Sequence, residues 1–499
     1  MYSAAKDRRN LLATLVLLLL CVSLVLLAMP ERERLLMYAI LWPLTVATLL
    51  LMVLHLPKKI TPVVWAGIGM SVWALFCNVI NGDLYLQFNL RYVYGITLAF
   101  GLGLCLMPVL GDLWERWLPA FLLAFALYAL ALAAISCYSC YRDRLIQLPF
   151  TEGTIGIVQY RLYGFNKHPN ELGCILNLGL LCWMMLAFRA PKWWLKAPCV
   201  LALLPICFTI SLTVSRTTIT LTALALGGFC LVLFTRKPTF LRWVAGLVVM
   251  ALVFAGSLWT MMTGIPQMLP SGAPQAQTEV QEAPVVDEIP EAIPAQPSEE
   301  PQADPAPATE PIPVDTPAIL EVAPTEQPSY EAAQVEAEVR QDQHLWQRSY
   351  TDGIGTFSMR TDLWKAGIQY LKDRPVTLLI GSTDGNVARI PSRMLGRSEY
   401  HLHNAWLEVL AQAGIPGFVM MLLVFLRMFW GSARLFFKSS TPGWMRILAA
   451  APVLMTACTL METYPAVSAN VSDMMMLLLC GAVIAADIQQ KNGVLQTKQ

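Results

Sequence analysis

The sequence contains little charge for its length. Only 14% of its 499 residues are Asp, Glu, Lys or Arg, whereas a soluble globular domain carries about 25%. Hydrophobic residues make up 56% of the chain. This balance excludes a set of soluble domains and favours a protein that crosses a membrane many times. The formal net charge of +1 gives no indication of a nucleic-acid partner.

Metal-binding motifs are also missing. The sequence has neither paired CxxC motifs nor HExxH, and we expect neither a metal nor a cofactor. The twelve cysteines lie mostly in apolar runs, and the long loop described below has none. Cys137 and Cys140 could pair at a membrane edge, although two thiols facing apolar surroundings are the commoner arrangement. The sequence leaves that choice open.

Apolar windows long enough to cross a bilayer recur along the chain. They lie near residues 11–29, 35–56, 61–80, 92–110, 117–137, 171–188, 195–214, 217–235, 241–262, 405–430, 444–462 and 471–487. We therefore predict an all-α polytopic membrane protein with about twelve transmembrane helices. The first window resembles a signal peptide, but it is long enough to span and shows no small-residue cleavage site, so we expect it to be retained.

Positive charge predicts the orientation of these spans. Lys6, Arg8 and Arg9 favour a cytoplasmic N-terminus, and most later basic loops alternate in agreement. An even number of spans also returns the C-terminus to the cytoplasm. The segments then expected on the extracytoplasmic side are 78–91, 138–170, 213–217, the long loop and 462–473. All the candidate site residues below lie in these segments or at their borders.

The long loop, between spans 9 and 10, has two parts of different composition. From Gly264 to about Val339 it contains no Lys or Arg and is rich in Pro, Glu, Ala and Gln, which predicts disorder. Residues 360–371 then predict an amphipathic helix of about three turns, suited to a membrane surface and ended by Arg374-Pro375. Its apolar stripe consists of Leu363, Trp364, Gly367, Ile368 and Leu371. Residues 378–385 predict a short strand or extended piece that runs into a glycine turn.

These features predict the following domain organisation. Residues 1–262 form transmembrane helices 1–9, 263–339 a disordered extracytoplasmic insert, 340–404 the folded part of the loop, 405–490 transmembrane helices 10–12, and 491–499 a cytoplasmic tail.

His403 is the first candidate for chemistry, at the point where the long loop re-enters the membrane. Asn404 is a good N-cap for a helix that begins near Ala405. The positive end of that helix dipole disfavours imidazolium, so the ring is expected to accept a proton near pH 7. An anchoring role at the helix end is the alternative. His401 is a weaker competitor because it lacks the neighbouring cap.

Basic residues on the same predicted side are further candidates. Arg216 lies at the edge of a span, where an arginine is costly unless it is paired or solvated, although it could also reach the lipid headgroups. Arg360 begins the loop helix, where a cation opposes the dipole. The basic and aromatic stretch from Arg161 to Asn170, which includes His168, would suit a phosphate or anionic lipid. Glu462 and Asp473 read as ordinary span boundaries.

Taken together, these motifs resemble the bacterial O-antigen ligase and O-antigen polymerase superfamily. The resemblance rests on Arg161-xx-Gly164 with His168-Pro169-Asn170, Ser215-Arg216, Arg360-xxx-Trp364, and His403-Asn404 followed after nine residues by Gly414-xx-Gly417. Their order and the position of the long loop agree as well. The insert is larger than the family needs, and the turn at 381–385 matches only approximately.

The resemblance implies a metal-independent, membrane-embedded glycosyltransferase that uses a polyprenyl-diphosphate-linked glycan on the extracytoplasmic face of the cell membrane. His403 would be the general base. Arg216 and Arg360 would hold the diphosphate, Arg161 would add a loop contact, and a glycan or cell-surface molecule would be the acceptor. His168 and Asn404 are expected to line the substrate site. The sequence does not separate ligase from polymerase. A transporter or flippase of lipid-linked oligosaccharide is the alternative, and a surface sensor that uses the acidic insert is a third possibility.

Overall fold

The computed structural model describes residues 62–81, 107–108, 114–142, 145–147, 154–158, 161–164, 169–235, 239–264, 360–383, 387, 389–395, 401–438, 440–462 and 471–491, together with residues 11 and 14. Most of the predicted spans at 11–29 and 92–110, the whole span at 35–56, and residues 265–339 of the predicted insert lie outside these residues.

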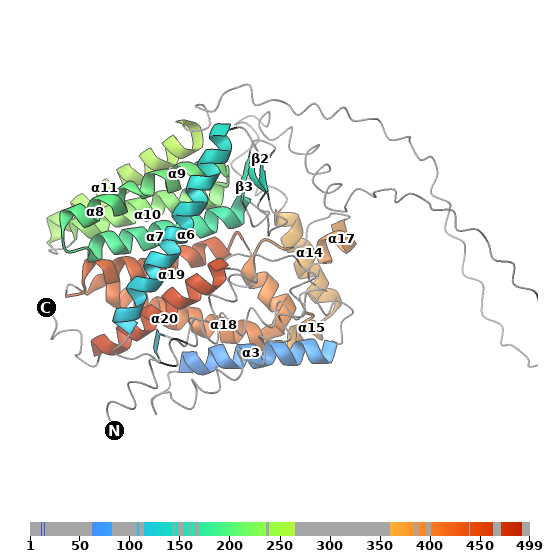
Figure 1. Ribbon diagram of the computed structural model, residues 1–499. Helices are drawn as coiled ribbons and strands as arrows, with labels where there is room; N and C mark the ends of the chain where they lie inside the picture. The colour runs from blue at the N-terminus through green and yellow to red at the C-terminus, as the bar shows by residue number, and fades with distance from the viewer. Residues whose placement is uncertain are drawn as a thin grey trace, which may run out of the picture. The chain divides into compact units, whose positions relative to one another are not determined.

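The described part of the chain is mostly helical (Figure 1). The helices of the first half are α3 (Pro62–Asn81), α6 (Trp114–Arg142), α7 (Pro169–Arg189), α8 (Trp193–Leu201), α9 (Leu203–Leu212), α10 (Arg216–Phe234) and α11 (Phe240–Trp259), which continues into a π-helical turn at Thr260–Gly264. The loop contributes α14 (Arg360–Asp373), α15 (Thr377–Ile380) and α17 (Ile390–Leu395). The last helices are α18 (Ala405–Phe437), α19 (Gly443–Thr459) and α20 (Val471–Lys491).

Within the described ranges, six helical stretches are long and apolar enough to cross a membrane. They are Trp114–Arg142, Pro169–Arg189, Trp193–Leu212, Arg216–Phe234, Phe240–Met262 and Ala405–Phe437. Helices α3, α19 and α20 coincide with three further predicted windows. The helical, multi-pass architecture is therefore confirmed, while the number of twelve spans remains a prediction.

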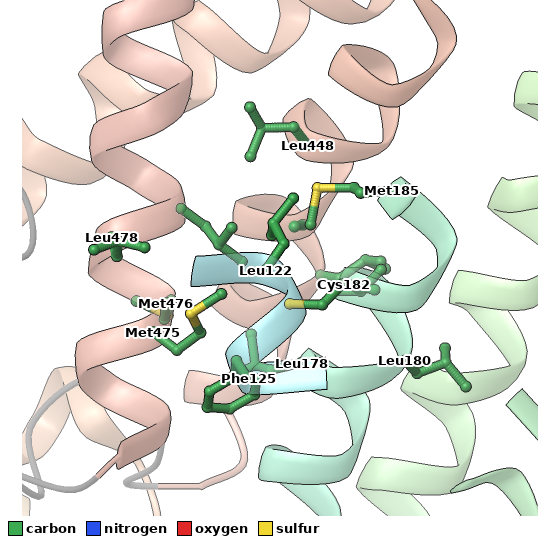
Figure 2. Packing of buried hydrophobic residues seen from close by; sticks show 14 of the residues in the cluster. Leu122, Phe125, Leu178, Leu180, Cys182, Met185, Leu448, Met475, Met476 and Leu478 are labelled. Atoms are coloured by element: carbon green, nitrogen blue, oxygen red, sulfur yellow. The ribbon is translucent and has the colours of Figure 1, made fainter. Parts of the chain in front are cut away.

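Helix α7 is the centre of the bundle. It contacts α6, α8, α9, α10, α19 and α20, and 89% of its most apolar window is buried, compared with 11% for α11. Figure 2 shows part of this core, where Leu122 and Phe125 of α6 lie beside Leu178, Cys182 and Met185 of α7, with Leu448 of α19 and Met475 and Met476 of α20 nearby. Side chains from both halves of the sequence thus form one apolar core.

Polar contacts join the helix ends that are predicted to be cytoplasmic. Arg189 Nη2 at the end of α7 donates to Glu115 O at the start of α6, 2.9 Å away. Arg446 Nη1 in α19 donates to Thr235 O after α10, 2.8 Å away. Farther along the chain, Arg427 and Arg434 of α18 both pair with the buried Asp487 of α20. The loops that the positive charges predict to be cytoplasmic therefore lie together at one end of the bundle.

A small antiparallel sheet follows α6, and it corrects the all-α prediction. Strand β2 (Thr154–Val158) pairs with β1 (Ile146–Gln147) on one side and with β3 (Arg161–Tyr163) on the other. Ser139 Oγ of α6 donates to Ile155 O, which fixes the sheet to the helix end. The strands are two to five residues long, so they gave no alternating pattern strong enough to predict them. Cys137 and Cys140 are not joined by a disulfide.

The loop helix α14 confirms the predicted helix, and it ends before Arg374-Pro375. Its buried face differs from the predicted stripe, because Ala366 and Tyr370 are buried whereas Ile368 is exposed. The predicted extended piece at 378–385 is wrong in its first part, since Thr377–Ile380 forms the short helix α15. The glycine turn that follows is present at Gly381, whose φ is +69°.

Helix α18 is broken at Gly414, which has φ +64° and ψ −171°. The backbone of the loop turn packs directly against this break, so that a Cβ placed on Gly381 would lie 2.1 Å from Gln412 O. The Ser382 and Thr383 N–H groups both donate to Gln412 O, at 3.2 and 3.3 Å. Only glycine adopts these backbone angles without strain. The break thus joins the loop to the start of α18.

Candidate active site

His403 occupies a strained backbone position immediately before α18. Its φ is +49°, a left-handed conformation that is uncommon for residues other than glycine. Leu402 before it and Ala405 after it are fully buried. Their packing holds the backbone in position on both sides of the turn at His403. The His403 side chain retains 21% exposure. Strain of this kind is found most often at functional sites.

Asn404 forms the N-cap that the sequence predicted. Its Oδ1 accepts a hydrogen bond from the Leu407 N–H, 3.0 Å away, and its Nδ2 donates to Leu460 O at 3.1 Å. Through these two hydrogen bonds the Asn404 side chain connects the start of α18 to the end of α19. A direct substrate contact by Asn404 remains a prediction.

Glu462, just after α19, is the residue on which the cluster converges. Its side chain is 0% exposed. One carboxylate oxygen, Oε1, pairs with Arg360 Nη2 and accepts from Asn170 Nδ2 at 2.9 Å. The other oxygen, Oε2, lies 3.2 Å from His403 Nδ1. One buried carboxylate thus joins α7, the loop helix α14 and the approach to α18.

Arg360 is the first residue of α14, and its side chain is 18% exposed. A cation at a helix N-terminus opposes the dipole, and its ion pair with Glu462 explains why one is found there. The structure therefore brings Arg360 and His403 together through a shared acid. Arg360 and His403 are 43 positions apart in the sequence.

Arg216 lies at the same end of the bundle, although it makes none of the contacts just described. It is exposed and begins α10, whose N-cap is Ser215. The buried side chains of Cys174, Leu221 and Cys458 bring α7, α10 and α19 together. Asn170 precedes Cys174 by one turn, and Arg216 precedes Leu221 by about one and a half turns. Both residues therefore lie beyond this junction in the same direction.

The structure describes Arg161 only in part and does not describe His168. Arg161 lies in β3, paired with Val158, and β3 contacts α7 and α9. Only its backbone is described. His168 lies outside the described residues. The proposed substrate contacts of these two residues remain predictions.

A second acid–histidine pair lies beside the first. His401 Nδ1 is 2.8 Å from Glu408 Oε1, and the Glu408 side chain is 1% exposed. Glu408 is in the first piece of α18, before the break at Gly414. This contact gives His401 an acidic partner of its own, so the two histidines form separate acid–histidine pairs.

Sequence reasoning missed Glu462, which it interpreted as an ordinary span boundary. No local pattern distinguishes it, because its partners Arg360 and His403 lie far from it in the sequence. Asn170 was noted only as the end of a basic stretch. Among the described residues, no group of three or more His, Cys, Asp or Glu side chains is arranged to hold a metal.

The long apolar helices define the chain as a multi-pass membrane protein, with histidine, arginine and carboxylate side chains gathered at one end of its bundle. A family model described as O-antigen ligase matches residues 200–422, from α8 into α18. This region is therefore similar to the O-antigen ligase family, which confirms the resemblance inferred from the motifs. The family implies a membrane enzyme that transfers glycan.

The matched region contains Arg216, Arg360, His403 and Asn404. It leaves out Arg161 and His168 before it and Glu462 after it. A comparison with curated proteins found no match.

Proposed function

We propose that this protein is an extracytoplasmic glycosyltransferase that transfers or polymerises glycan from a polyprenyl-diphosphate-linked donor onto a glycan or cell-surface acceptor. The observation that supports the proposal best is the contact of His403 and Arg360 with one buried carboxylate, in a chain whose central region matches O-antigen ligases. The proposed enzyme lies in the cell membrane with both termini in the cytoplasm.

His403 is the proposed general base. A hydrogen bond from the His403 Nδ1–H group to Glu462 keeps the proton on Nδ1. The other ring nitrogen, Nε2, is then unprotonated and can accept a proton. That nitrogen removes the proton from the acceptor hydroxyl as the oxygen attacks the anomeric carbon of the donor. The bond from that carbon to the diphosphate oxygen breaks in the same step. A single displacement of this kind inverts the anomeric configuration.

Arg216 and Arg360 are the proposed diphosphate ligands. A polyprenyl diphosphate is already a good leaving group, and guanidinium groups can neutralise the charge that develops on it without a metal. Arg216 is exposed at the first turn of α10, where the helix dipole also favours an anion. Arg161 would supply a further loop contact.

The test is turnover by the purified protein, with the release of polyprenyl diphosphate from a lipid-linked oligosaccharide as the measurement. We expect Arg216→Ala to slow release at least about 10-fold, because a charge-assisted bond to the leaving group is lost, and Arg216→Lys to recover part of the rate. Arg242→Ala is the matched control, since Arg242 is also an exposed arginine in the first turn of a spanning helix, but at the predicted cytoplasmic end. Equal rates for Arg216→Ala and wild type would contradict the assignment.

The transporter alternative predicts a different result. A flippase would move the donor across vesicle membranes and leave the sugar–diphosphate bond intact. Release of polyprenyl diphosphate together with an extended glycan would therefore exclude transport as the whole function. Donor movement without cleavage would overturn the proposal.

The acidic insert is proposed to be dispensable for transfer. Deleting residues 270–338 removes no residue of the Arg360–Glu462–His403 cluster, so we expect transfer by the shortened protein to stay within about 2-fold of wild type, as for changes remote from reacting groups. The measurement is glycan profiling of cells that produce either form at equal levels. Complete loss of glycan in cells with the shortened protein would favour the sensor or scaffold hypothesis instead.

A further inference from the structure

We infer that Glu462 is a positioning residue that links the base to the donor-binding arginine through its two carboxylate oxygens. This inference rests on the proposed function, because it assigns Glu462 a role through His403 and Arg360. Glu462 itself is too buried to act on substrate, with a side-chain exposure of 0%.

The division of contacts between the two oxygens carries the inference. Oε1 receives Arg360 Nη2 and Asn170 Nδ2, while Oε2 faces His403 Nδ1. Neither partner can move far without changing the orientation of the carboxylate that the other contacts. The position of the arginine and the direction of the imidazole ring are therefore set together.

The backbone of Glu462 is held as firmly as its side chain. Its N–H donates to Cys458 O at 2.9 Å, and its carbonyl accepts from the Ala405 N–H at 3.3 Å. The second bond satisfies one of the N–H groups that the first turn of α18 leaves unpaired. The carboxylate thus projects from a fixed point between the end of α19 and the start of α18.

Charge explains why a carboxylate is used here. Arg360 and Glu462 together are neutral, so the arginine can be buried before the donor arrives at a far smaller cost than that of an unpaired charge. The carboxylate also fixes the proton on Nδ1 and stabilises the imidazolium formed when the base accepts a proton. Asn170 adds a hydrogen bond and no charge. Glu171 is another buried carboxylate close to this junction, and the His401–Glu408 pair lies beside it.

A purely structural ion pair is the competing explanation, and the rate per folded molecule distinguishes the two. Glutamine at position 462 keeps the shape and one acceptor oxygen but removes the negative charge. Without that charge the imidazolium formed in the reaction loses its partner, so kcat falls in molecules that remain folded. Loss of a structural pair alone would lower the amount of folded protein and leave kcat per folded molecule unchanged.

The experiment compares Glu462→Gln with Glu462→Asp and with Asp373→Asn, which changes an exposed carboxylate of the same loop helix α14. We expect the Gln variant to lower kcat per folded molecule by about 10- to 100-fold, the range seen when the partner of a metal-ligating histidine is removed, and to change KM for the acceptor less. The Asp variant should recover part of kcat, and Asp373→Asn should match wild type.

A second readout does not require turnover. Carbethoxylation modifies an accessible imidazole, and mass spectrometry of the His403 peptide at one fixed pH gives the rate of modification. We expect this rate to change in Glu462→Gln, because the ring loses the carboxylate that orients it, and to equal that of wild type in Asp373→Asn. An unchanged rate in folded Glu462→Gln would overturn the inference, even if the wild-type protein proved active. If the rate changes in the variant but wild type releases no polyprenyl diphosphate, the proposed function alone is contradicted.

Discussion

Replacing His403 with alanine should abolish glycan transfer while leaving the protein folded. Removing a general base costs about 10²- to 10⁴-fold in rate, and the side chain is partly exposed, so its loss leaves no large cavity. Histidine adopts this left-handed backbone more readily than alanine does, so we expect a small loss of stability and an unchanged fold. The measurement is polyprenyl diphosphate release at matched concentrations of folded, monodisperse protein.

His401→Ala is the control for this prediction. His401 contacts the buried Glu408 rather than Glu462, so its loss should lower stability more than it lowers the rate per folded molecule. If His401→Ala were the inactive variant and His403→Ala retained near wild-type turnover, the assignment of the base would be wrong. Glycan profiles of cells that carry each variant would provide the same comparison in vivo.

Replacing Gly381 with alanine should be the most destabilising single substitution in the loop. Its φ of +69° and ψ of −176° lie in a region that is essentially limited to glycine, and a Cβ there would lie 2.1 Å from Gln412 O. The atom in the way is backbone, so a rotamer change cannot relieve the contact. We expect a loss of about 3 kcal/mol or more in the free energy of unfolding, measured as a fall in the thermal unfolding midpoint in detergent.

Gly256→Ala is the matched control, because a Cβ at Gly256 in α11 meets no atom within 4 Å. Its midpoint should equal or slightly exceed that of wild type, since alanine favours a helix over glycine by about 1 kcal/mol. Equal midpoints for the two alanine variants would show that the turn yields easily, and would remove the basis for treating the loop and α18 as one rigid connection.

The helices were the most predictable part of this fold, because a lipid-crossing segment must satisfy its own backbone and so appears as a long apolar run. The N-cap at Asn404 and the helix from Arg360 followed from local rules of the same kind. The sheet at 146–163 could not be predicted from such rules, because its strands are too short to show an alternating hydrophobic pattern. The turn after Ile380 was placed correctly, but three apolar residues before it were read as extended, and short apolar runs do not distinguish strand from helix.

The basic residues of the candidate site could be predicted from the sequence, whereas the role of its acidic residue could not. His403, Arg216 and Arg360 stood out because each is polar at a place where the local pattern gives it no reason to be. Glu462 acquires its importance from contacts with residues 59 and 102 positions earlier in the chain. Such contacts depend on how α7, α14, α18 and α19 meet, and no single segment carries that information.

The break at Gly414 divides α18 into two pieces that contact different parts of the protein. The piece before the break is tied to the loop through Gln412 O and to α3 through the bond from Trp73 Nε1 to Ala413 O, 2.7 Å long. The piece after it is tied to α20 through Arg427, Arg434 and Asp487. We therefore expect a displacement of α14 and α15 to move the first piece of α18, with His403 in front of it, while the piece after the break stays with α20.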